Sequence, residues 1–583
     1  MLHATALSSA VQSSSLAGSG SKLDDVSFSL PNGHLLAVIG AADSGRSQLL
    51  QLLAGLRHPT TGSLHGFGTD LLSQPLPSGQ LGYVVPAEDS LHGLLTVRET
   101  LMSAHFLRVA ASTPELRVDR VSHLLVVLGL ETVASKRVAQ LSPAQQRRLM
   151  LGLALVTDAP LLLCDEMTAG LNVRSQQELV ALLKFVTEDL SGRIVIHATE
   201  TLGNLASYDS VLILHEGRVC FHGPPRALTH YFSISTVDEL YPRLAQRPAE
   251  RWGESWARHR ESYYQAFQIA SAPTKPSTPP HDETTHPARA EDILSPPKPT
   301  KQPVPMTTLP SLAAQTLHLL HRRWTLWQRH QAEWLEHLAL FILCPIVTLL
   351  LVSPNAGYLA EVRAGTTAPE ALWPGAYTCT MVLLIQGLMI SLISLRTGFR
   401  EIAAERVLFE RERIAGLRVG AFLASKLGFL IPLMTAHGAA LVLLAELTGA
   451  SLPGHASLRL VLLMLTGIAF GCLCLGLSAT SRSPEVAENR AWKLWSANLL
   501  LSGALLGFPR PLGMVLQPFL TLFQGWSGSV DTLAGQPVFA LLTQFVHTWF
   551  AKPGSAVIAL LLHATAGIAL AAWGLKRRRL SAH

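Results

Sequence analysis

A glycine-bounded turn near the start of the chain has the residues for phosphate binding. It reads Gly40-Ala41-Ala42-Asp43-Ser44-Gly45-Arg46-Ser47-Gln48 and lies between an apolar run and a helical stretch. Backbone N–H groups in such a turn, together with the N-terminus of the following helix, point at phosphate oxygens. The Ser47 hydroxyl is a hard oxygen ligand of the kind that Mg²⁺ prefers. Arg46 stands where this pattern normally has lysine, so the charge is kept on a bulkier, planar group.

Two carboxylates, Asp165 and Glu166, end a second apolar run at 161–164. Asp165 can complete a Mg²⁺ shell with Ser47, and Glu166 can act as the catalytic residue by polarising an attacking water. A third segment, Leu141-Ser142-Pro143-Ala144-Gln145, lies between these two and precedes a helical stretch. The turn at 40–48 and the Asp165–Glu166 pair together predict a nucleotide-phosphate site with Ser47 and Asp165 as metal ligands.

Short apolar runs position these residues. The runs at 35–40, 81–85, 161–164, 194–199 and 210–214 alternate with helical stretches, which predicts parallel strands with crossover helices. Residues 271–310 contain 11 prolines and cannot build a core, so we expect a linker there. The predicted divisions are a flexible N-terminus (1–21), the α/β domain (22–232), a helical extension (233–270), the proline-rich linker (271–310), an amphipathic connecting helix (311–333) and a membrane domain (334–583).

The composition of the second half indicates a membrane protein. The chain is 48% hydrophobic and only 15% charged, whereas soluble domains carry about 25% charged residues. Its net charge of +6 is modest and lies largely beside apolar stretches, which argues against nucleic-acid binding. Spans of about 20 residues are expected in a bilayer. The stretches that we assign to spans are 335–354, 373–395, 419–445, 457–479, 494–508 and 554–574.

Basic residues predict the orientation of these spans. Residues 396–418 contain six arginines, whereas the loop at 355–370 contains only Arg363. By the positive-inside rule, the N- and C-termini are expected in the cytoplasm. Lys426 lies within the third span, where a charge is a functional candidate, or it snorkels toward the cytosolic loop. The helix at 311–333 is expected either at the membrane interface or packed on the soluble domain.

These motifs resemble one half of an ABC transporter of the G subfamily, with an ABC-2 type membrane domain. A further match is the coupling segment that contains Glu405, Arg406, Phe409, Arg411, Glu412, Arg413 and Gly416. The resemblance implies an α/β P-loop nucleotide-binding domain followed by an all-α membrane domain of six helices. It also implies ATP and Mg²⁺ as cofactors, a lipid bilayer, and a second ABC half-transporter as the partner.

The chain departs from the family pattern at positions that contact phosphate. Pro143 and Ala144 replace two signature glycines, and Pro143 has no backbone N–H to donate. Glu200 stands at the position of the switch histidine, where a carboxylate would repel a γ-phosphate. Ala87 stands where the family has a glutamine, and His197 lies three residues before the switch position, where it is expected to be a packed strand residue.

These departures predict poor ATPase activity for the chain alone. We expect a heterodimeric exporter of a hydrophobic or amphipathic substrate, in which a competent half supplies the missing signature. A homodimer that tolerates the substitutions is a second possibility. A non-hydrolysing pseudo-ATPase that acts as a regulatory or scaffold subunit is the third.

Overall fold

The computed structural model describes residues 1–9, 23–74, 76–77, 79–84, 91–110, 112–188, 192–267, 309–365, 368–447, 451–504, 510–545 and 548–577. The chain divides into two compact units. The first contains residues Met1–Glu88 and Leu95–Pro310, and the second contains Asp89–Leu94 and Ser311–His583. The proline-rich segment at 271–310 lies almost entirely outside the described residues.

A six-stranded sheet forms the centre of the first unit. Its order is β10-β9-β3-β8-β7-β6, and every pair is parallel except β10 with β9. All five predicted strands are present. The strands are β3 (Leu35–Ile39), β6 (Leu81–Val84), β7 (Leu161–Asp165), β8 (Ile194–Thr199), β9 (Ser210–His215) and β10 (Arg218–Gly223). Their nearly unbroken apolar sequences follow from burial on both faces of a mostly parallel sheet.

A second, four-stranded sheet corrects the expectation of a flexible N-terminus for residues 2–9. Residues Leu2–Ser9 form β1, which pairs with β2 (Leu23–Leu30) and β4 (Thr61–Gly66). The remaining strand is β5 (Thr69–Asp70). Leu2, Ala4 and Leu7 are fully buried, so this small-residue segment is ordered by the apolar face it presents to the sheet. Residues 10–22 lie outside the described residues.

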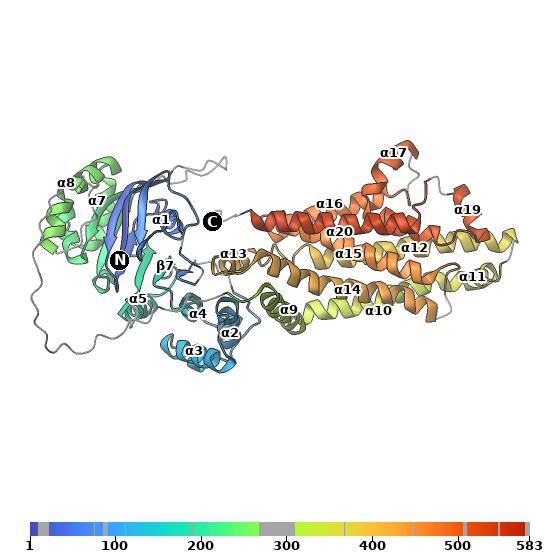
Figure 1. Ribbon diagram of the computed structural model, residues 1–583, viewed down its shortest axis with the longest axis horizontal. Helices are drawn as coiled ribbons and strands as arrows, with labels where there is room; N and C mark the ends of the chain where they lie inside the picture. The colour runs from blue at the N-terminus through green and yellow to red at the C-terminus, as the bar shows by residue number, and fades with distance from the viewer. Residues whose placement is uncertain are drawn as a thin grey trace, which may run out of the picture. The chain divides into compact units, whose positions relative to one another are not determined.

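Helices cover the first unit's sheets (Figure 1). They are α1 (Arg46–Leu53), α2 (Val97–Arg108), α3 (Pro114–Val127), α4 (Pro143–Leu155), α5 (Val173–Glu188), α6 (Leu228–Phe232), α7 (Leu240–Ala245) and α8 (Ala249–Phe267). The last two make up the helical extension. Helix α8 covers the edge strand β10 through packed aromatic rings, among them Trp256 and Phe221, which are tilted at 55° with a centroid distance of 5.2 Å.

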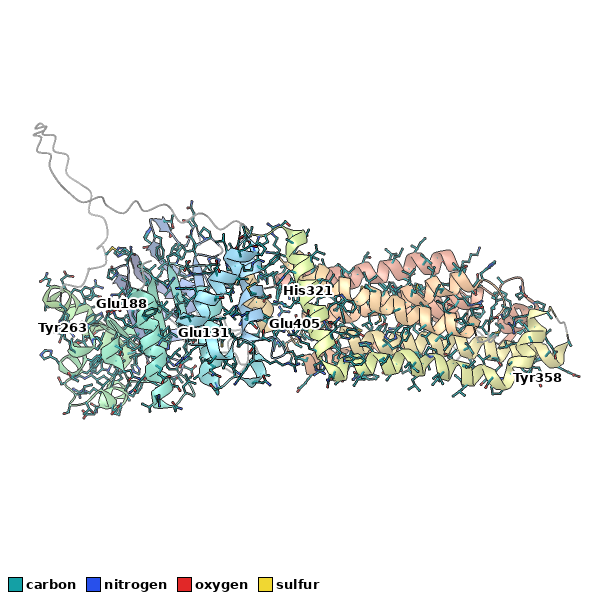
Figure 2. All side chains as sticks on the ribbon, turned by 90° about the horizontal axis from the view of Figure 1, so that it is seen from below. Glu131, Glu188, Tyr263, His321, Tyr358 and Glu405 are labelled. Atoms are coloured by element: carbon teal, nitrogen blue, oxygen red, sulfur yellow. The ribbon has the colours of Figure 1, made fainter. Side chains whose placement is uncertain are left out.

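The described part of the second unit is helical, and its long helices run alongside one another (Figure 1). The helices of this unit, long and short, are α9 (Leu312–Arg329), α10 (Gln331–Val352), α11 (Ala356–Arg363), α12 (Pro369–Gly398), α13 (Arg406–Ile414), α14 (Val419–Leu447), α15 (Ala456–Thr480), α16 (Pro484–Leu501), α17 (Arg510–Leu516), α18 (Thr521–Asp531), α19 (Pro537–Phe545) and α20 (Pro553–Lys576). Tyr358 on α11 and His321 on α9 lie toward opposite ends of this bundle (Figure 2).

Five helical segments among the described residues are long and apolar enough to cross a membrane. They are Gln331–Arg363, Glu370–Gly398, Val419–Leu447, Ala456–Thr480 and Pro553–Lys576, and each contains one predicted span. The predicted span at 494–508 falls partly on α16 and partly on residues outside the described ranges, so the sixth span stays a prediction. Apolar side chains of α10 and α20 are exposed, including Leu350 and Leu562, as expected of a surface facing lipid.

Small residues let the bundle helices approach closely. Helices α15 and α20 pack against each other, and Gly476 faces Gly567 at their contact. A Cβ on Gly567 would lie 2.4 Å from the backbone carbon of Cys472, so only glycine fits at this contact. Without a hydrophobic force between helices in lipid, such close backbone packing stabilises the association.

Candidate functional site

The turn at 40–48 connects the buried strand β3 to α1, as the sequence predicts. Asp43 and Gly45 adopt positive φ angles of 62° and 98°, which turn the backbone back toward the helix. A Cβ on Gly40 would lie 2.5 Å from the carbonyl oxygen of Leu214. Gly40 is therefore required by close packing against Leu214, and Gly45 is favoured by its left-handed backbone geometry.

Ser47 and Asp165 meet at the carboxyl end of the sheet. The Ser47 hydroxyl donates a 3.0 Å hydrogen bond to Asp165 Oδ1, although 118 residues separate them. Burial raises the pKa of the Asp165 carboxyl, while Ser47 and Arg46 oppose that rise. Among the described residues, the buried Ser44 Oγ and Gln48 Oε1 have no hydrogen-bond partner. Free polar atoms and a hydroxyl–carboxylate pair suit a nucleotide phosphate with its Mg²⁺, so these residues fit that ligand.

Arg46 makes two ion pairs within the same site. Its Nη1 lies 2.6 Å from Glu166 Oε1, and its Nη2 lies 2.5 Å from Glu200 Oε1. The Arg46 side chain is buried, whereas Glu200 is about half exposed. Burial raises the pKa of the Glu166 carboxyl; the neighbouring Arg46 opposes this, and Glu200 and Asp165 add to it. The sequence predicted Glu200 at this site, but it did not predict that Arg46 would bind Glu166 and Glu200 together.

Tyr241 was missed by the sequence analysis. Its hydroxyl lies 2.6 Å from the backbone carbonyl oxygen of Glu200 and 3.2 Å from that of Gly40, and donates to both. It thereby joins α7 of the helical extension to the phosphate-binding turn and to the segment after β8. No local motif marks this tyrosine, because the contact spans 201 residues of sequence to Gly40.

His197 is a buried strand residue, as expected. It lies in β8, and its Nδ1 is 2.7 Å from the hydroxyl of Tyr208. Burial lowers the pKa of the imidazole to about 3, so the ring is neutral. Ala87 lies outside the described residues.

The segment 141–145 forms the start of α4. The Ser142 hydroxyl accepts from the backbone N–H of Gln145, and the Gln145 side chain accepts from the backbone N–H of Ser142. Pro143 occupies the first helical position, where a missing N–H does no harm to the helix. Ser142 and Pro143 are exposed, Ala144 and Gln145 are half-buried, and Leu141 is buried. The local fold is therefore intact, while the N–H donor at position 143 is absent.

The predicted coupling segment forms the short helix α13 and the turn before it. Arg406 donates to the carbonyl oxygen of Ala479 at 2.5 Å, and Arg413 donates to that of Leu575 at 2.7 Å. These carbonyls belong to the C-terminal turns of α15 and α20, where cations stabilise the helix dipole. Phe409 packs on Phe422 of α14 at a ring distance of 4.5 Å. Arg411 lies on the same helix.

Gly416 ends the coupling segment with a positive φ of 110°. Its carbonyl oxygen accepts a hydrogen bond from the Gln315 side chain of α9 at 3.3 Å. The same glutamine accepts from the backbone N–H of Arg418 at 3.2 Å. Helix α9 therefore packs on the coupling segment and on α14, where Trp324 meets Phe429 at 5.0 Å.

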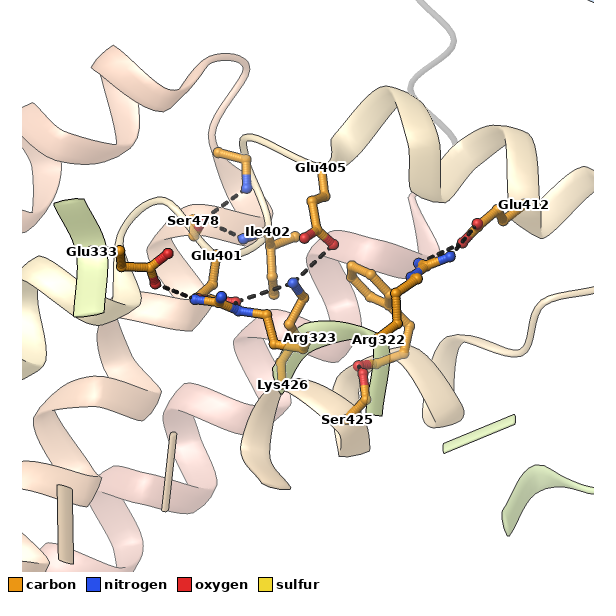
Figure 3. Close-up of polar contacts among 12 residues, drawn as sticks. Arg322, Arg323, Glu333, Glu401, Ile402, Glu405, Glu412, Ser425, Lys426 and Ser478 are labelled. Atoms are coloured by element: carbon orange, nitrogen blue, oxygen red, sulfur yellow. Dashed lines mark hydrogen bonds and ion pairs between the residues drawn. The ribbon is translucent and has the colours of Figure 1, made fainter. Parts of the chain in front are cut away.

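A buried ion cluster surrounds Lys426 (Figure 3). Its ammonium lies 3.1 Å from Glu401 and 2.8 Å from Glu405, and the side chain is 3% exposed. Lys426 does reach toward the loop before α13, as snorkelling predicts, but two carboxylates and not water receive its charge. Arg323 pairs with Glu401 and Glu333, and Arg322 makes a bidentate pair with Glu412 at 2.6 and 3.0 Å.

Comparison with known proteins agrees with the fold of the first unit. The ABC transporter family matches residues 23–169. The chain therefore carries an ABC transporter nucleotide-binding domain, which is fused to a helical domain with several candidate membrane spans.

Three relatives extend this result. The ABC transporter ATP-binding/permease protein Rv1747 of Mycobacterium tuberculosis is 26% identical over 500 residues, which is 84% of this chain and 53% of that protein. The cobalamin import ATP-binding protein BtuD of Halobacterium salinarum is 33% identical over 233 residues, or 39% of this chain and 57% of that protein. The ABC transporter G family member 19 of Arabidopsis thaliana is 33% identical over 223 residues, or 36% of this chain and 30% of that protein. The chain thus spans about half the length, or less, of these relatives.

Proposed function

We propose that this chain is an ATP-binding half of an ABC exporter of the G-subfamily type, and that it works with a second, competent half. Binding and hydrolysis of ATP between the two nucleotide-binding domains would move a hydrophobic or amphipathic substrate across the membrane. The similarity to an ATP-binding/permease protein over 84% of the chain supports the joint presence of both domains. The arginine-rich loop at 396–418 supports cytoplasmic termini.

The observation that carries the proposal is the asymmetry between two parts of the nucleotide-binding domain. Ser47 and Asp165 are in contact and Glu166 follows Asp165, so the residues expected to bind Mg²⁺ and to act on water lie together, which supports the proposal. The signature helix begins instead with Pro143, which has no N–H to offer to a nucleotide held by a partner. One lost donor of this kind costs about 10²–10³ in rate. A partner with an intact signature would restore one of the two sites.

The residues of this chain would act as follows. Mg²⁺ bound by Ser47 and Asp165 would neutralise charge on the phosphates. Backbone N–H groups of the turn at 40–48 would hold the phosphates at the start of α1. Glu166 would orient a water and accept its proton, for which it must first leave Arg46. The arginines of α13 would carry domain movement to α15 and α20, whose ends they bind.

A second candidate is favoured by the Arg46 ion pairs. Glu166, the proposed base, is held by a cation, and Glu200 stands at the switch position. In this alternative the chain is a non-hydrolysing pseudo-ATPase that acts as a regulatory or scaffold subunit of a membrane complex. A homodimer would repeat the signature defect in both sites, which argues against it.

The test is ATP hydrolysis in lipid nanodiscs, by the chain alone and by the chain co-purified with each ABC half encoded near it. We expect slow hydrolysis alone, a large increase with one partner, and loss of that increase in Glu166→Gln of this chain. Glu254→Gln, an exposed carboxyl on α8, is the matched control. Normal turnover by the chain alone would remove the need for a partner. A stimulated rate that survives Glu166→Gln would favour the pseudo-ATPase.

A further inference from the structure

The phosphate end of the nucleotide site already contains an anion supplied by the chain. Both Nη atoms of Arg46 are engaged by carboxylates, Glu166 on one side and Glu200 on the other. Arg46 is the cation of the phosphate-binding turn. A terminal phosphate that approached this guanidinium would have to displace one of these two carboxylates.

The position of Glu200 is fixed by more than its ion pair. Its backbone carbonyl is held by the Tyr241 hydroxyl, which also binds Gly40 at the start of the turn. The residue before it, Thr199, is buried at the end of β8, and its hydroxyl lies 3.1 Å from that of Thr168. Glu200 is therefore anchored next to the phosphate-binding turn, with its carboxylate directed at Arg46.

We propose that Glu200 is a built-in substitute for the γ-phosphate, so that the site of this chain binds a nucleoside diphosphate in preference to a nucleoside triphosphate. The inference rests on the proposed function, because it assumes that the turn at 40–48 binds nucleotide. The inference goes beyond that function because it states which nucleotide, the diphosphate, the site binds more tightly.

The physical reason is that different hydrogen-bond donors of the turn contact different phosphates. Backbone N–H groups of such a turn hold the α- and β-phosphates, whereas the basic side chain serves the β- and γ-phosphates. A diphosphate uses the backbone donors and leaves both Arg46 ion pairs intact. A triphosphate adds negative charge beside Glu166 and Glu200 and competes for Arg46, the cation with which both are paired. Juxtaposed like charges are strongly unfavourable where water is partly excluded.

This preference has a consequence for the transport cycle. Product would leave slowly after any cleavage at this site, and fresh triphosphate would enter poorly. Each cycle at this site would then wait for diphosphate to leave, even with a partner that supplies an intact signature. Slow turnover would follow from Glu200 and Arg46, independently of the defect at Pro143.

The test measures two affinities on the full chain in nanodiscs by isothermal titration calorimetry at saturating Mg²⁺. The probes are ADP and the non-hydrolysable β,γ-imido analogue of ATP. For the unaltered chain we expect ADP to bind at least about tenfold more tightly than the triphosphate analogue. Glu200→Gln keeps the size of the side chain and removes its charge, and we expect it to erase or reverse this ratio. Glu200→His is a second variant with the same expected result.

Glu254→Gln is the matched control, since it removes one exposed carboxyl of the same unit far along the chain from the site. It should leave the ratio unchanged. Equal or tighter binding of the triphosphate by the unaltered chain would overturn the inference and leave the proposed function standing. A diphosphate preference that persists in both Glu200 variants would also overturn it. Failure to bind either nucleotide would overturn the proposed function as well.

Discussion

Two ion clusters in this protein are both built from basic side chains and glutamates, but they differ in the ratio of cations to carboxylates and in burial. The phosphate-end cluster contains Arg46, Glu166 and Glu200, so one cation serves two carboxylates. The bundle cluster sets three cations against four carboxylates, and its members are Arg322, Arg323, Lys426, Glu333, Glu401, Glu405 and Glu412. Glu200 is 52% exposed, whereas Glu401 and Lys426 are 6% and 3% exposed.

The difference in exposure determines what happens when a charged side chain loses its ion-pair partner. A half-exposed carboxylate that loses its cation stays in contact with water, so the fold tolerates the loss of that cation at small cost. A buried charge that loses its partner has no such alternative. The bundle cluster therefore holds α9, α14 and the loop before α13 together, whereas the phosphate-end cluster adds little to the stability of the first unit.

The largest expected effect comes from removing one cation from each cluster. Lys426→Met would remove a buried cation that pairs with Glu405 and with the buried Glu401, and should destabilise the protein by about 3–5 kcal/mol. Arg46→Met leaves carboxylates that water can reach, so its cost should be about 1 kcal/mol or less. Thermal unfolding of the detergent-purified protein, followed by size-exclusion chromatography, measures both. Equal losses in the two variants would contradict the proposed difference between the clusters.

The two clusters should also respond to pH with opposite signs. Burial alone would raise the pKa of Glu405, but Lys426, His92 and Arg322 lower it to about 2. The stability that this carboxylate contributes is present at neutral pH and is lost as the pH falls from about 4.5 toward 2. The pKa of Glu166 is raised by burial, so its contribution is greatest at low pH and is lost as the pH rises through that raised value.

Thermal midpoints of three proteins between about pH 8 and about pH 4 measure this difference. The advantage of the unaltered chain over Glu405→Gln should stay constant to about pH 5 and then shrink. Glu166→Gln should gain stability relative to the unaltered chain as the pH rises. If the stability difference from the unaltered chain changed with pH in the same direction for both variants, the assigned pKa shifts would be wrong. Those shifts are a lowered pKa for Glu405 and a raised pKa for Glu166.

A substitution at Tyr241 tests whether Glu200 must be held in place for the phosphate-end cluster to form. Tyr241→Phe removes the hydroxyl that binds the carbonyl oxygens of Glu200 and Gly40, and should cost about 1 kcal/mol. It should also weaken the diphosphate preference, because Glu200 is then less firmly placed. Calorimetry and thermal unfolding measure the two effects. Tyr263→Phe, on the same helical extension, is the control that should leave nucleotide affinity unchanged.

The smallest effect is expected at an exposed ion pair of the bundle. Arg396 and Glu336 lie 2.9 Å apart, with 44% and 41% of their side chains exposed. Glu336→Gln should change stability by about 0.5 kcal/mol or less, since exposed pairs gain little and are screened by salt. A loss comparable to that in Lys426→Met would show that proximity, and not burial, determines the strength of these pairs.

Much of the architecture could be predicted from the sequence because it depends on local periodicity. The parallel strands appear as short apolar runs, and five spans appear as long ones. Strand β1 could not be predicted in this way. Its residues are small and mixed, and only pairing with β2 and β4 orders them. His197 could be assigned to a strand from its neighbours, but its partner Tyr208 could not.

The sequence by itself determined which residue types are available for phosphate, metal and coupling, because those motifs are contiguous. Only the tertiary structure decided which charges meet. Arg46 binds Glu200 across 154 residues, and Arg322 binds Glu412 across 90. Coulomb attraction depends on distance in space and on exclusion of water, and neither quantity is encoded by spacing along the chain.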